Sequence, residues 1–359
     1  MRTVILHDLS VDEHDFATRT GWTIKPEGAC KAEVCVPLPA DVRQADDRLD
    51  VSVLAERLGM PLVADPAQGI WALGPETTVT GKVLTSAVAP ELELPDAEGN
   101  TFKLSSLRGK KVVLVSWASW CGCRFDLPLW QNLRDRWQAN GVEVVTVALD
   151  VDASEARPFI EKAHAEHPSL IDEAHVSDEL FGFVNVPNGV WIDEDGVIVR
   201  PAEPAHPGRN PANESFRKVD VSTVPPDVAE MLVEARKIKS DPDIYVEMID
   251  DWIENGTESR YALAPDEVVR RSDPRSNGEA TAAAEFELGQ YLHRAGNHEA
   301  AIPHWREAHR LYPDNWTYKR QAWQFEDPFR QGHTDAYDSS WFEDLKKIGA
   351  ENYYPEIVP

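Results

Sequence analysis

Positive charge and long apolar runs are both scarce in this sequence, and each shortage excludes a class of function. Lys and Arg number 36 against 62 Asp and Glu, which gives a formal net charge of −26. Sequence-independent binding of nucleic acid or anionic lipid requires clustered basic side chains, so neither partner is expected. The longest apolar runs have the length of a β-strand, far below the roughly 20 residues that cross a membrane. No membrane-spanning segment is therefore predicted.

The sequence also lacks the motifs of several enzyme classes and of secretion. It has no Gly-rich phosphate loop, no nucleophilic Ser elbow and no zinc-protease motif, and its 11 histidines form no ligand cluster. We therefore predict no cofactor and no histidine metal site. The first residues, MRTVILHDLSVDEHDF, turn acidic early and lack the long apolar stretch and small-residue cleavage site of a secretory signal. A cytoplasmic protein is expected.

Cysteine is rare, and its few positions are informative. The only four, Cys30, Cys35, Cys121 and Cys123, form two close pairs. Because structural disulfides are uncommon in the cytoplasm, such pairs favour redox or metal chemistry. One pair directly follows the apolar run VVLVSWASW and precedes a predicted helix. The other lies in GWTIKPEGACKAEVCVPLP, which its Gly and Pro residues mark as a loop.

The chain divides into four predicted parts. Residues 1–85 alternate short apolar runs with turn signals and contain a helix after a cap at Asp50, which indicates a small α+β domain. Residues 86–203 have the order β-α-β-α-β-β, typical of an α/β domain with a mixed sheet flanked by helices. Residues 204–225 are rich in Pro and polar residues and are predicted to be a linker. Residues 226–359 have a helical pattern.

Within the helical part, small and large residues alternate at the offsets of a known repeat. They are Leu288, Gly289, Ala301, Trp305, Ala308 and Pro313. Residues 282–315 thus resemble a tetratricopeptide repeat, in which small residues let two antiparallel helices approach and proline ends the second. One repeat cannot bury its own face, so helices near 226–255 and 315–330 are expected to complete a stack. That stack is either a cap on the α/β domain or a groove for a protein partner.

The α/β part carries the motifs of one redox family. They are Trp120-Cys121 after a buried strand, the run Cys123-Arg124-x-Asp126-x-Pro128, Val186-Pro187 before an edge strand, and the turn Ile192-Asp193-x-x-Gly196. Residues 86–203 therefore resemble the TlpA/ResA-like branch of the thioredoxin superfamily, an AhpC/TSA-like redoxin domain. The resemblance implies a thioredoxin-like fold. The family usually has two residues between its cysteines, whereas this sequence has only Gly122, so the missing residue falls inside the motif.

The motif predicts Cys121 as the attacking residue. The amino terminus of the following helix favours a thiolate there, because unpaired N–H groups and the helix dipole stabilise the anion. The thiolate would form a mixed disulfide with the substrate, and either Cys123 or the Cys30/Cys35 pair would resolve it.

The resemblance assigns further residues to the site. Pro187 matches the family's cis-proline, and Val186 would offer its backbone groups to an extended substrate. Asp126 either tunes the thiols and transfers protons or is only an exposed acid at a helix start. Trp117 and Trp120 are predicted to wall the site, and Gly122 is predicted to contact the substrate.

Three roles remain open for Cys30 and Cys35. They are a second redox pair that exchanges with Cys121, structural thiols, or a soft-metal site. If all four cysteines converge, their thiolates suit Zn(II), Cu(I) or Hg(II).

The sequence supports three competing functions. The first is a cytoplasmic thiol–disulfide oxidoreductase that uses a protein or small-molecule disulfide and a thiol reductant. The second is a thiol peroxidase with Cys121 as the peroxidatic residue, although Ala118 and the missing proline depart from the usual Pro-x-x-x-Thr/Ser-x-x-Cys frame. The third is a non-catalytic binding, scaffold or soft-metal-handling protein.

Overall fold

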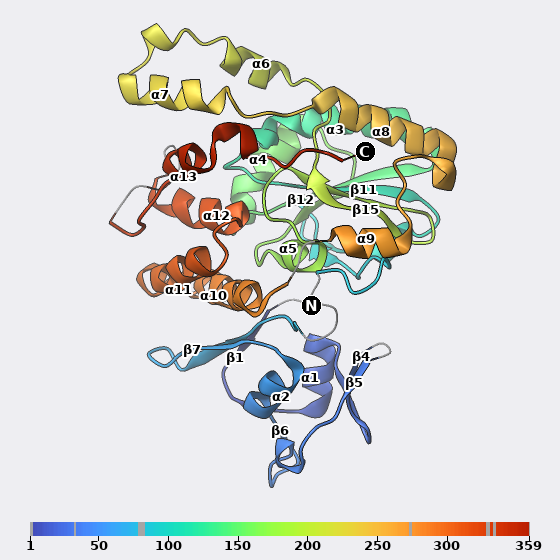
Figure 1. Cartoon of the computed structure of the whole chain (residues 1–359), viewed down its shortest axis with the longest axis vertical. Coiled ribbons are helices and arrows are strands. Elements are labelled where there is room, and N and C mark those ends of the chain that lie inside the picture. The colour runs from blue at the N-terminus through green and yellow to red at the C-terminus, as the bar shows by residue number, and fades with distance from the viewer. Residues whose placement is uncertain are drawn as a thin grey trace. The chain divides into compact units, whose positions relative to one another are not determined.

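The computed structural model describes residues 3–31, 34–77, 83–272, 275–327, 331–332 and 335–358. The chain forms two compact units, and each combines segments that are distant in sequence (Figure 1). The first unit contains Met1–Thr85, Ala174–Gly182 and Ser272–Tyr318. The second contains Ser86–Glu173, Phe183–Arg271 and Lys319–Pro359.

The amino-terminal part of the first unit is a small α+β structure, as predicted. Its strands are β1 (Val4–Leu6), β2 (Ser10–Val11), β3 (Thr23–Lys25), β4 (Gly28–Lys31), β5 (Val34–Val36), β6 (Leu49–Asp50), β7 (Leu62–Asp65) and β8 (Ile70–Leu73), and its helices are α1 (Glu13–Thr20) and α2 (Val51–Leu58). The strands pair in three small sheets, β1-β8-β7, β2-β6 and β3-β4-β5. The cap of α2 is confirmed, because the Asp50 carboxylate accepts hydrogen bonds from the amides of Ser52 and Val53.

The loop prediction for the first cysteine pair is wrong. Cys30 and Cys35 lie directly opposite each other on the antiparallel strands β4 and β5. Gly28 does not mark a loop there. A Cβ at this position would lie 2.1 Å from the carbonyl oxygen of Val36, so glycine allows the two strands to approach.

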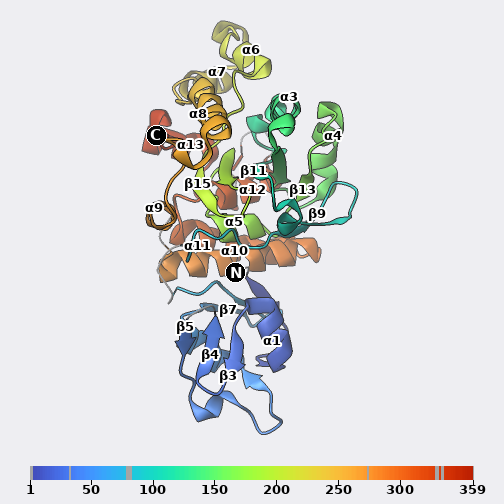
Figure 2. The same ribbon diagram turned by 90° about the vertical axis from the view of Figure 1, so that its right-hand side faces the viewer.

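The predicted helical hairpin lies in the first unit, where α10 (Asn277–Arg294) and α11 (His298–Leu311) run beside each other (Figure 2). A Cβ on Gly289 would lie 2.5 Å from Nε1 of Trp305, so the small residue permits the close approach, as expected. Helix α10 also contacts β1, β7 and β8 of the same unit, as well as α11. The assignment as a tetratricopeptide repeat stays a prediction.

The second unit is built on a five-stranded mixed sheet, which confirms the predicted thioredoxin-like architecture. Its strands are β11 (Lys111–Trp117), β12 (Val142–Ala148), β13 (Ser169–Ile171), β14 (Asn188–Ile192) and β15 (Ile198–Pro204), in the order β13-β12-β11-β14-β15. Strands β11, β12 and β13 are parallel, and β14 and β15 are antiparallel to their neighbours. The hairpin of β9 (Glu93–Pro95) and β10 (Thr101–Lys103) precedes them. The sequence order missed β13 and α5 (Val176–Phe181), which are too short to show a periodic pattern.

Helices cover this sheet and extend the second unit. They are α3 (Leu127–Trp137), α4 (Ala153–Ala163), α6 (Pro211–Arg217), α7 (Pro226–Ala235), α8 (Pro242–Asn255), α9 (Pro265–Arg271), most of α12 (Trp316–Glu326), and α13 (Trp341–Ile348). Helices α3 and α8 pack on one face of the sheet in a shared apolar core (Figures 1 and 2). In that core Trp191 of β14 stacks on Trp252 at 5.3 Å between ring centroids. Helix α8 thus buries its apolar face on the sheet, whereas we expected it to pack in a stack with the repeat. In the part of the chain that the structure describes, no helix is both long and apolar enough to cross a membrane.

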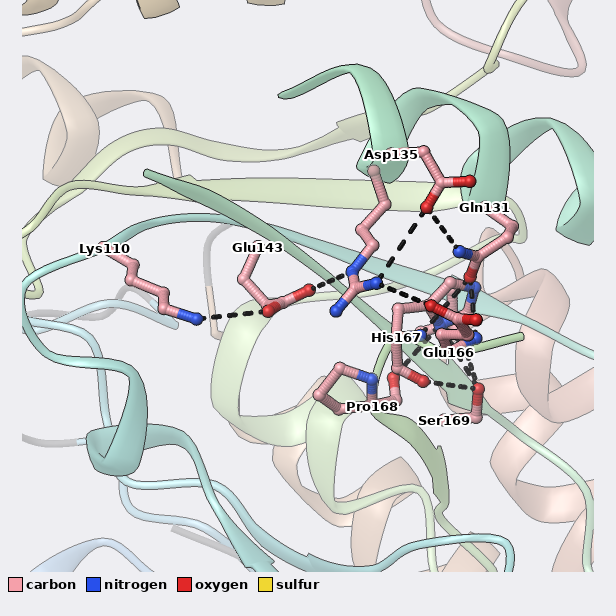
Figure 3. A network of polar contacts seen from close by, with 10 residues as sticks. Lys110, Gln131, Asp135, Glu143, Glu166, His167, Pro168 and Ser169 are labelled. Carbon is pink, nitrogen blue, oxygen red and sulfur yellow. Dashed lines mark hydrogen bonds and ion pairs between the residues drawn. The ribbon is translucent and has the colours of Figure 1, made fainter. Parts of the chain in front are cut away.

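A polar network holds α3 to the strands beneath it (Figure 3). Glu143 on β12 accepts hydrogen bonds from Nε of Arg134 at 2.9 Å and from Nζ of Lys110 at 3.3 Å. The side-chain oxygen of Gln131 accepts the amide of Glu166 at 2.7 Å. Because these bonds are partly shielded from water, they fix the helix that follows the cysteine motif more firmly than surface ion pairs would.

Candidate active site

The second cysteine pair lies where the central strand leaves the sheet. Strand β11 ends at Trp117, and Cys121 caps a short 3₁₀ turn, Gly122–Asp126, that leads into α3. The α-helix therefore begins at Leu127 and not at Cys121 as we expected. The Sγ atom of Cys121 accepts the amide of Cys123 at 3.3 Å. Both thiols are free and buried, with Cys121 only 4% exposed.

The predicted proline loop faces this pair. The Val186–Pro187 peptide bond is cis. The carbonyl oxygen of Val186 lies 3.6 Å from Sγ of Cys121, and Pro187 lines the same cavity as both cysteines. The structure thus brings together residues that are 65 positions apart in the sequence.

The pKa values of the two thiols are shifted in opposite directions. Burial raises the pKa of Cys121. The hydrogen bond to the Cys123 thiol, the positive charge of Arg320 and the Cys123 amide together lower it from an ordinary value of 9.0 to about 6. Burial, together with the hydrogen bond and negative charge of Cys121, raises the pKa of Cys123 well above 9.0. At neutral pH the pair therefore consists of a Cys121 thiolate and a protonated Cys123 thiol.

The charge that stabilises the thiolate comes from α12, a part of the chain that sequence reasoning did not connect with the site. The guanidinium of Arg320 donates to the side-chain oxygen of Gln331 at 2.8 Å, to the hydroxyl of Tyr353 at 3.0 Å and to the carbonyl oxygen of Trp120 at 3.2 Å. Its Cζ atom lies 4.7 Å from the centre of the Trp120 ring. The one sequence signal is a basic pair inside the aromatic segment WTYKRQAWQF, which does not reveal what it contacts.

A tyrosine from the carboxyl-terminal segment covers the proline loop. The hydroxyl of Tyr354 donates to the carbonyl oxygen of Val186 at 2.9 Å. The amide of Val186 donates to the side-chain oxygen of Asn185 at 2.9 Å. Both backbone groups that the sequence analysis offered to an extended substrate therefore have partners within the chain.

Asp126 is buried beside the cysteines, so the alternative of an exposed acid at a helix start is wrong. Burial raises its pKa. The hydrogen bond from Asn210 at 2.6 Å opposes that change, the charge of Cys121 adds to it, and the resulting pKa is about 7. A carboxyl group of this pKa exchanges protons readily at neutral pH, which suits an acid–base role.

The two predicted wall residues serve packing. Neither Trp117 nor Trp120 is among the described residues that line the cavity, whereas Gly122 is. The Trp117 ring packs edge-to-face on Phe159 at 6.4 Å, and Nε1 of Trp120 donates to the side chain of Gln321 at 3.0 Å.

The cavity over the cysteines has a volume of about 1010 Å³. Its described lining comes from the cysteine motif and Pro187, from residues between positions 206 and 242 that include α6 and α7, and from Arg320, Gln331, Trp341, Tyr353 and Tyr354. The segment predicted as a linker, residues 204–225, thus supplies part of the wall.

The first cysteine pair is oxidised. A disulfide joins Cys30 and Cys35, and Cys35 is exposed. While they are bonded, these sulfurs are not thiolate ligands for a metal. Exchange of this disulfide with Cys121 stays a prediction.

Comparison with known proteins agrees with the site. Residues 85–200 match the model of the AhpC/TSA family. This part of the chain is an AhpC/TSA-family domain. The thiol-disulfide oxidoreductase ResA of Bacillus thuringiensis subsp. konkukian is 29% identical over 115 residues, which cover 31% of this chain and 65% of ResA. ResA of Bacillus anthracis is 31% identical over 114 residues, with the same two shares, 31% and 65%.

The AhpC/TSA-family domain accounts for only a part of the protein. The chain spans 65% of the length of these ResA relatives, just under two thirds. A solved thioredoxin domain of a thiol-disulfide oxidoreductase from Bacteroides vulgatus is 25% identical to this chain. The matched region covers 33% of this chain and 89% of that domain, with a TM-score of 0.31. The predicted redoxin resemblance is confirmed for residues 85–200, and it does not extend to the segments that supply Arg320 and Tyr354.

Proposed function

We propose that this chain is a thiol–disulfide oxidoreductase in which Cys121 attacks a disulfide and Cys123 resolves the product. One observation carries the proposal: two free thiols that are hydrogen-bonded to each other line the same cavity as the cis-proline Pro187. The pKa of one thiol is lowered and that of the other is raised. The ionised thiol is a nucleophile at neutral pH, while its neighbour is held in reserve as a protonated thiol. The names of the ResA relatives support the same reaction class.

In the first step the Cys121 thiolate attacks one sulfur of the substrate disulfide. The new bond joins Cys121 to that sulfur, the substrate S–S bond breaks, and the other half leaves as a thiolate that takes a proton. The leaving half carries away the electron pair of the broken bond.

In the second step Cys123 loses its proton and attacks the sulfur of Cys121. The carboxylate of Asp126 accepts that proton, for which its pKa of about 7 is suited. The second half of the substrate leaves as a thiol, and a Cys121–Cys123 disulfide remains. Two electrons have passed from the protein dithiol to the substrate, and an external dithiol restores the reduced protein for the next turnover.

The proposal is tested by trapping the intermediate. Reduced protein is mixed with one equivalent of a small disulfide, quenched with acid and analysed by mass spectrometry. We expect Cys123→Ser to accumulate a mixed disulfide at Cys121, Cys121→Ser to form none, and the unaltered protein to reach an internal Cys121–Cys123 bond. Unchanged disulfide exchange in Cys121→Ser would overturn the proposal.

Two matched measurements separate the alternatives. A Cys30→Ser/Cys35→Ser double variant should still resolve the mixed disulfide at Cys121. If the mixed disulfide accumulated in this variant, the first cysteine pair would be the resolving group. Rapid consumption of hydrogen peroxide without any disulfide exchange would instead support the peroxidase hypothesis. The cytoplasmic location and a protein partner on the α10–α11 hairpin stay predictions.

A further inference from the structure

We infer that the substrate is a small, anionic disulfide that enters the cavity over Cys121, and not an extended segment of a protein. The inference rests on the proposed function, because it names the class of molecule that the Cys121 thiolate attacks. Three features support it, namely the occupied proline loop, the enclosure of the sulfur and the charge of the cavity wall.

The two backbone groups of Val186 in the proline loop already have hydrogen-bond partners within the chain. Extended peptides bind by pairing their main chain with unpaired backbone groups of the receptor. The carbonyl of Val186 already accepts the hydroxyl of Tyr354 at 2.9 Å, and its amide already donates to Asn185 at 2.9 Å. A peptide that paired with Val186 would have to displace Asn185 from the amide and share the carbonyl oxygen with Tyr354, so this mode of recognition is disfavoured.

The sulfur is enclosed in the wall of the cavity. Cys121 is 4% exposed, and the cavity that it lines has a volume of about 1010 Å³. This volume lies at the upper end of the range for small-molecule sites, roughly 300–1,000 Å³. The wall also presents apolar side chains, including Phe216 and Met231, against which the carbon chain of a small ligand can pack.

The cavity reverses the charge balance of the protein. The chain has 36 basic against 62 acidic residues, yet the described cavity lining has five arginines against three acids. The arginines are Arg124, Arg209, Arg217, Arg236 and Arg320, and the acids are Asp126, Glu214 and Asp241. An acidic protein that gathers guanidinium groups around its nucleophile attracts anions to that point.

Two of these arginines have charge available for a ligand. Arg217 donates to the carbonyl oxygen of Ile238 at 3.5 Å, and Arg236 donates to the carbonyl oxygen of Val219. Among the described residues neither arginine forms an ion pair with a carboxylate. The buried Nε of Arg236 also has no hydrogen-bond partner in the described part of the chain. A substrate carboxylate in the cavity would pair with the positive charge of these guanidinium groups.

The test compares two small disulfides of similar length and opposite charge, 3,3′-dithiodipropionate and cystamine. Reduced protein reacts with each in a stopped-flow experiment, and each rate constant is divided by that of free dithiothreitol with the same disulfide, which removes differences in leaving-group acidity. After this division, we expect the rate constant for dithiodipropionate to exceed that for cystamine on the order of tenfold. This preference for the dianion should fall as salt is added.

Substitutions locate the preference. Arg217→Gln and Arg236→Gln should each reduce this preference several-fold by slowing the reaction with dithiodipropionate, whereas the reaction with cystamine should not become slower. Arg157→Gln is the matched control, because Arg157 also donates to a backbone carbonyl, that of Ala97 at 2.9 Å, and is not among the described lining residues. This variant loses the same charge and should keep the full preference. Circular dichroism melts verify that all three variants fold.

The outcomes separate this inference from the proposed function. Equal corrected rates for dianion and dication, or reduction of insulin as fast as that of dithiodipropionate, would overturn the inference and leave the oxidoreductase intact. Failure of every disulfide to react at Cys121 would overturn the proposed function and, with it, this inference.

Discussion

Removal of the Arg320 charge should convert the Cys121 thiolate into a thiol. The pKa of Cys121 falls from 9.0 to about 6 because the Cys123 thiol, the Arg320 guanidinium and the Cys123 amide together outweigh burial. A full positive charge within a few ångströms typically lowers the pKa of an acid by about 1 to 3 pH units. We therefore expect Arg320→Met to raise the pKa of Cys121 by a similar amount.

The structure also gives the size of the effect on ionisation. With a pKa of about 6, Cys121 is about nine-tenths ionised at pH 7. A rise of about 2 pH units would leave roughly one-tenth ionised at that pH. The rate at pH 7 is a poor measure of this change, because a thiolate of higher pKa is also more nucleophilic and the two effects nearly cancel. The pKa itself is the decisive quantity.

The assay follows thiolate absorbance at 240 nm between pH 4 and 10, together with the pH dependence of iodoacetamide alkylation at Cys121. Lys319→Met is the control, since it removes the neighbouring cation of α12, whose Nζ bonds Asp344 and is not part of the described cavity wall. Arg320→Lys keeps the positive charge but loses the forked set of guanidinium donors. In this variant the pKa of Cys121 should lie between its values in Arg320→Met and in the unaltered protein. An Arg320→Met protein that folds and keeps the original titration would refute the electrostatic role.

Three further predictions concern other parts of the structure. Because burial raises the pKa of Asp126 from 3.8 to about 7, the unaltered protein loses stability as pH rises through this window. Asp126→Asn should therefore stabilise the protein at pH 8 by at most about 4 kcal/mol and should not stabilise it at pH 3.5. Urea unfolding at the two pH values measures this difference, and equal effects at both would contradict the prediction. Tyr354→Phe frees the carbonyl before the cis-proline and should speed insulin reduction without changing the rate with dithiodipropionate, and a slower insulin reaction would count against it. Gly289→Ala should cost about 1–3 kcal/mol by overpacking, whereas Gly278→Ala, whose added Cβ would meet no atom closer than 3.6 Å, should not destabilise α10 in thermal melts.

Local motifs made much of the second unit predictable. The buried strand before Cys121, the proline loop and the turn at residues 193–196 each have a signature within a few neighbouring residues, and all three form. The prediction of a loop at Cys30 and Cys35 is wrong, because Gly and Pro residues mark a loop as readily as a close approach of two strands.

The electrostatic part of the site could not be predicted in the same way. Arg320 bonds the carbonyl of Trp120, a residue 200 positions earlier, and Tyr354 reaches the Val186 carbonyl across 168 positions. Without the fold, a buried arginine in an aromatic helix looks the same as an exposed one. Contacts of this sequence separation depend on how the whole carboxyl-terminal segment folds back, and no short pattern encodes that.

The Cys121 thiolate is stabilised by groups other than the α-helix that follows it. The effect of a helix dipole is confined to the first turn of the helix, yet α3 begins at Leu127, beyond the 3₁₀ turn that Cys121 caps. The dipole of α3 therefore contributes little at Cys121. The Cys123 thiol, the Arg320 charge from α12 and the Cys123 amide stabilise the thiolate instead, and Gln331 and Tyr353 hold Arg320 in place. The segment that carries this charge also closes the proline loop through Tyr354, so stabilising the thiolate and restricting its substrates are two effects of the same folded-back chain.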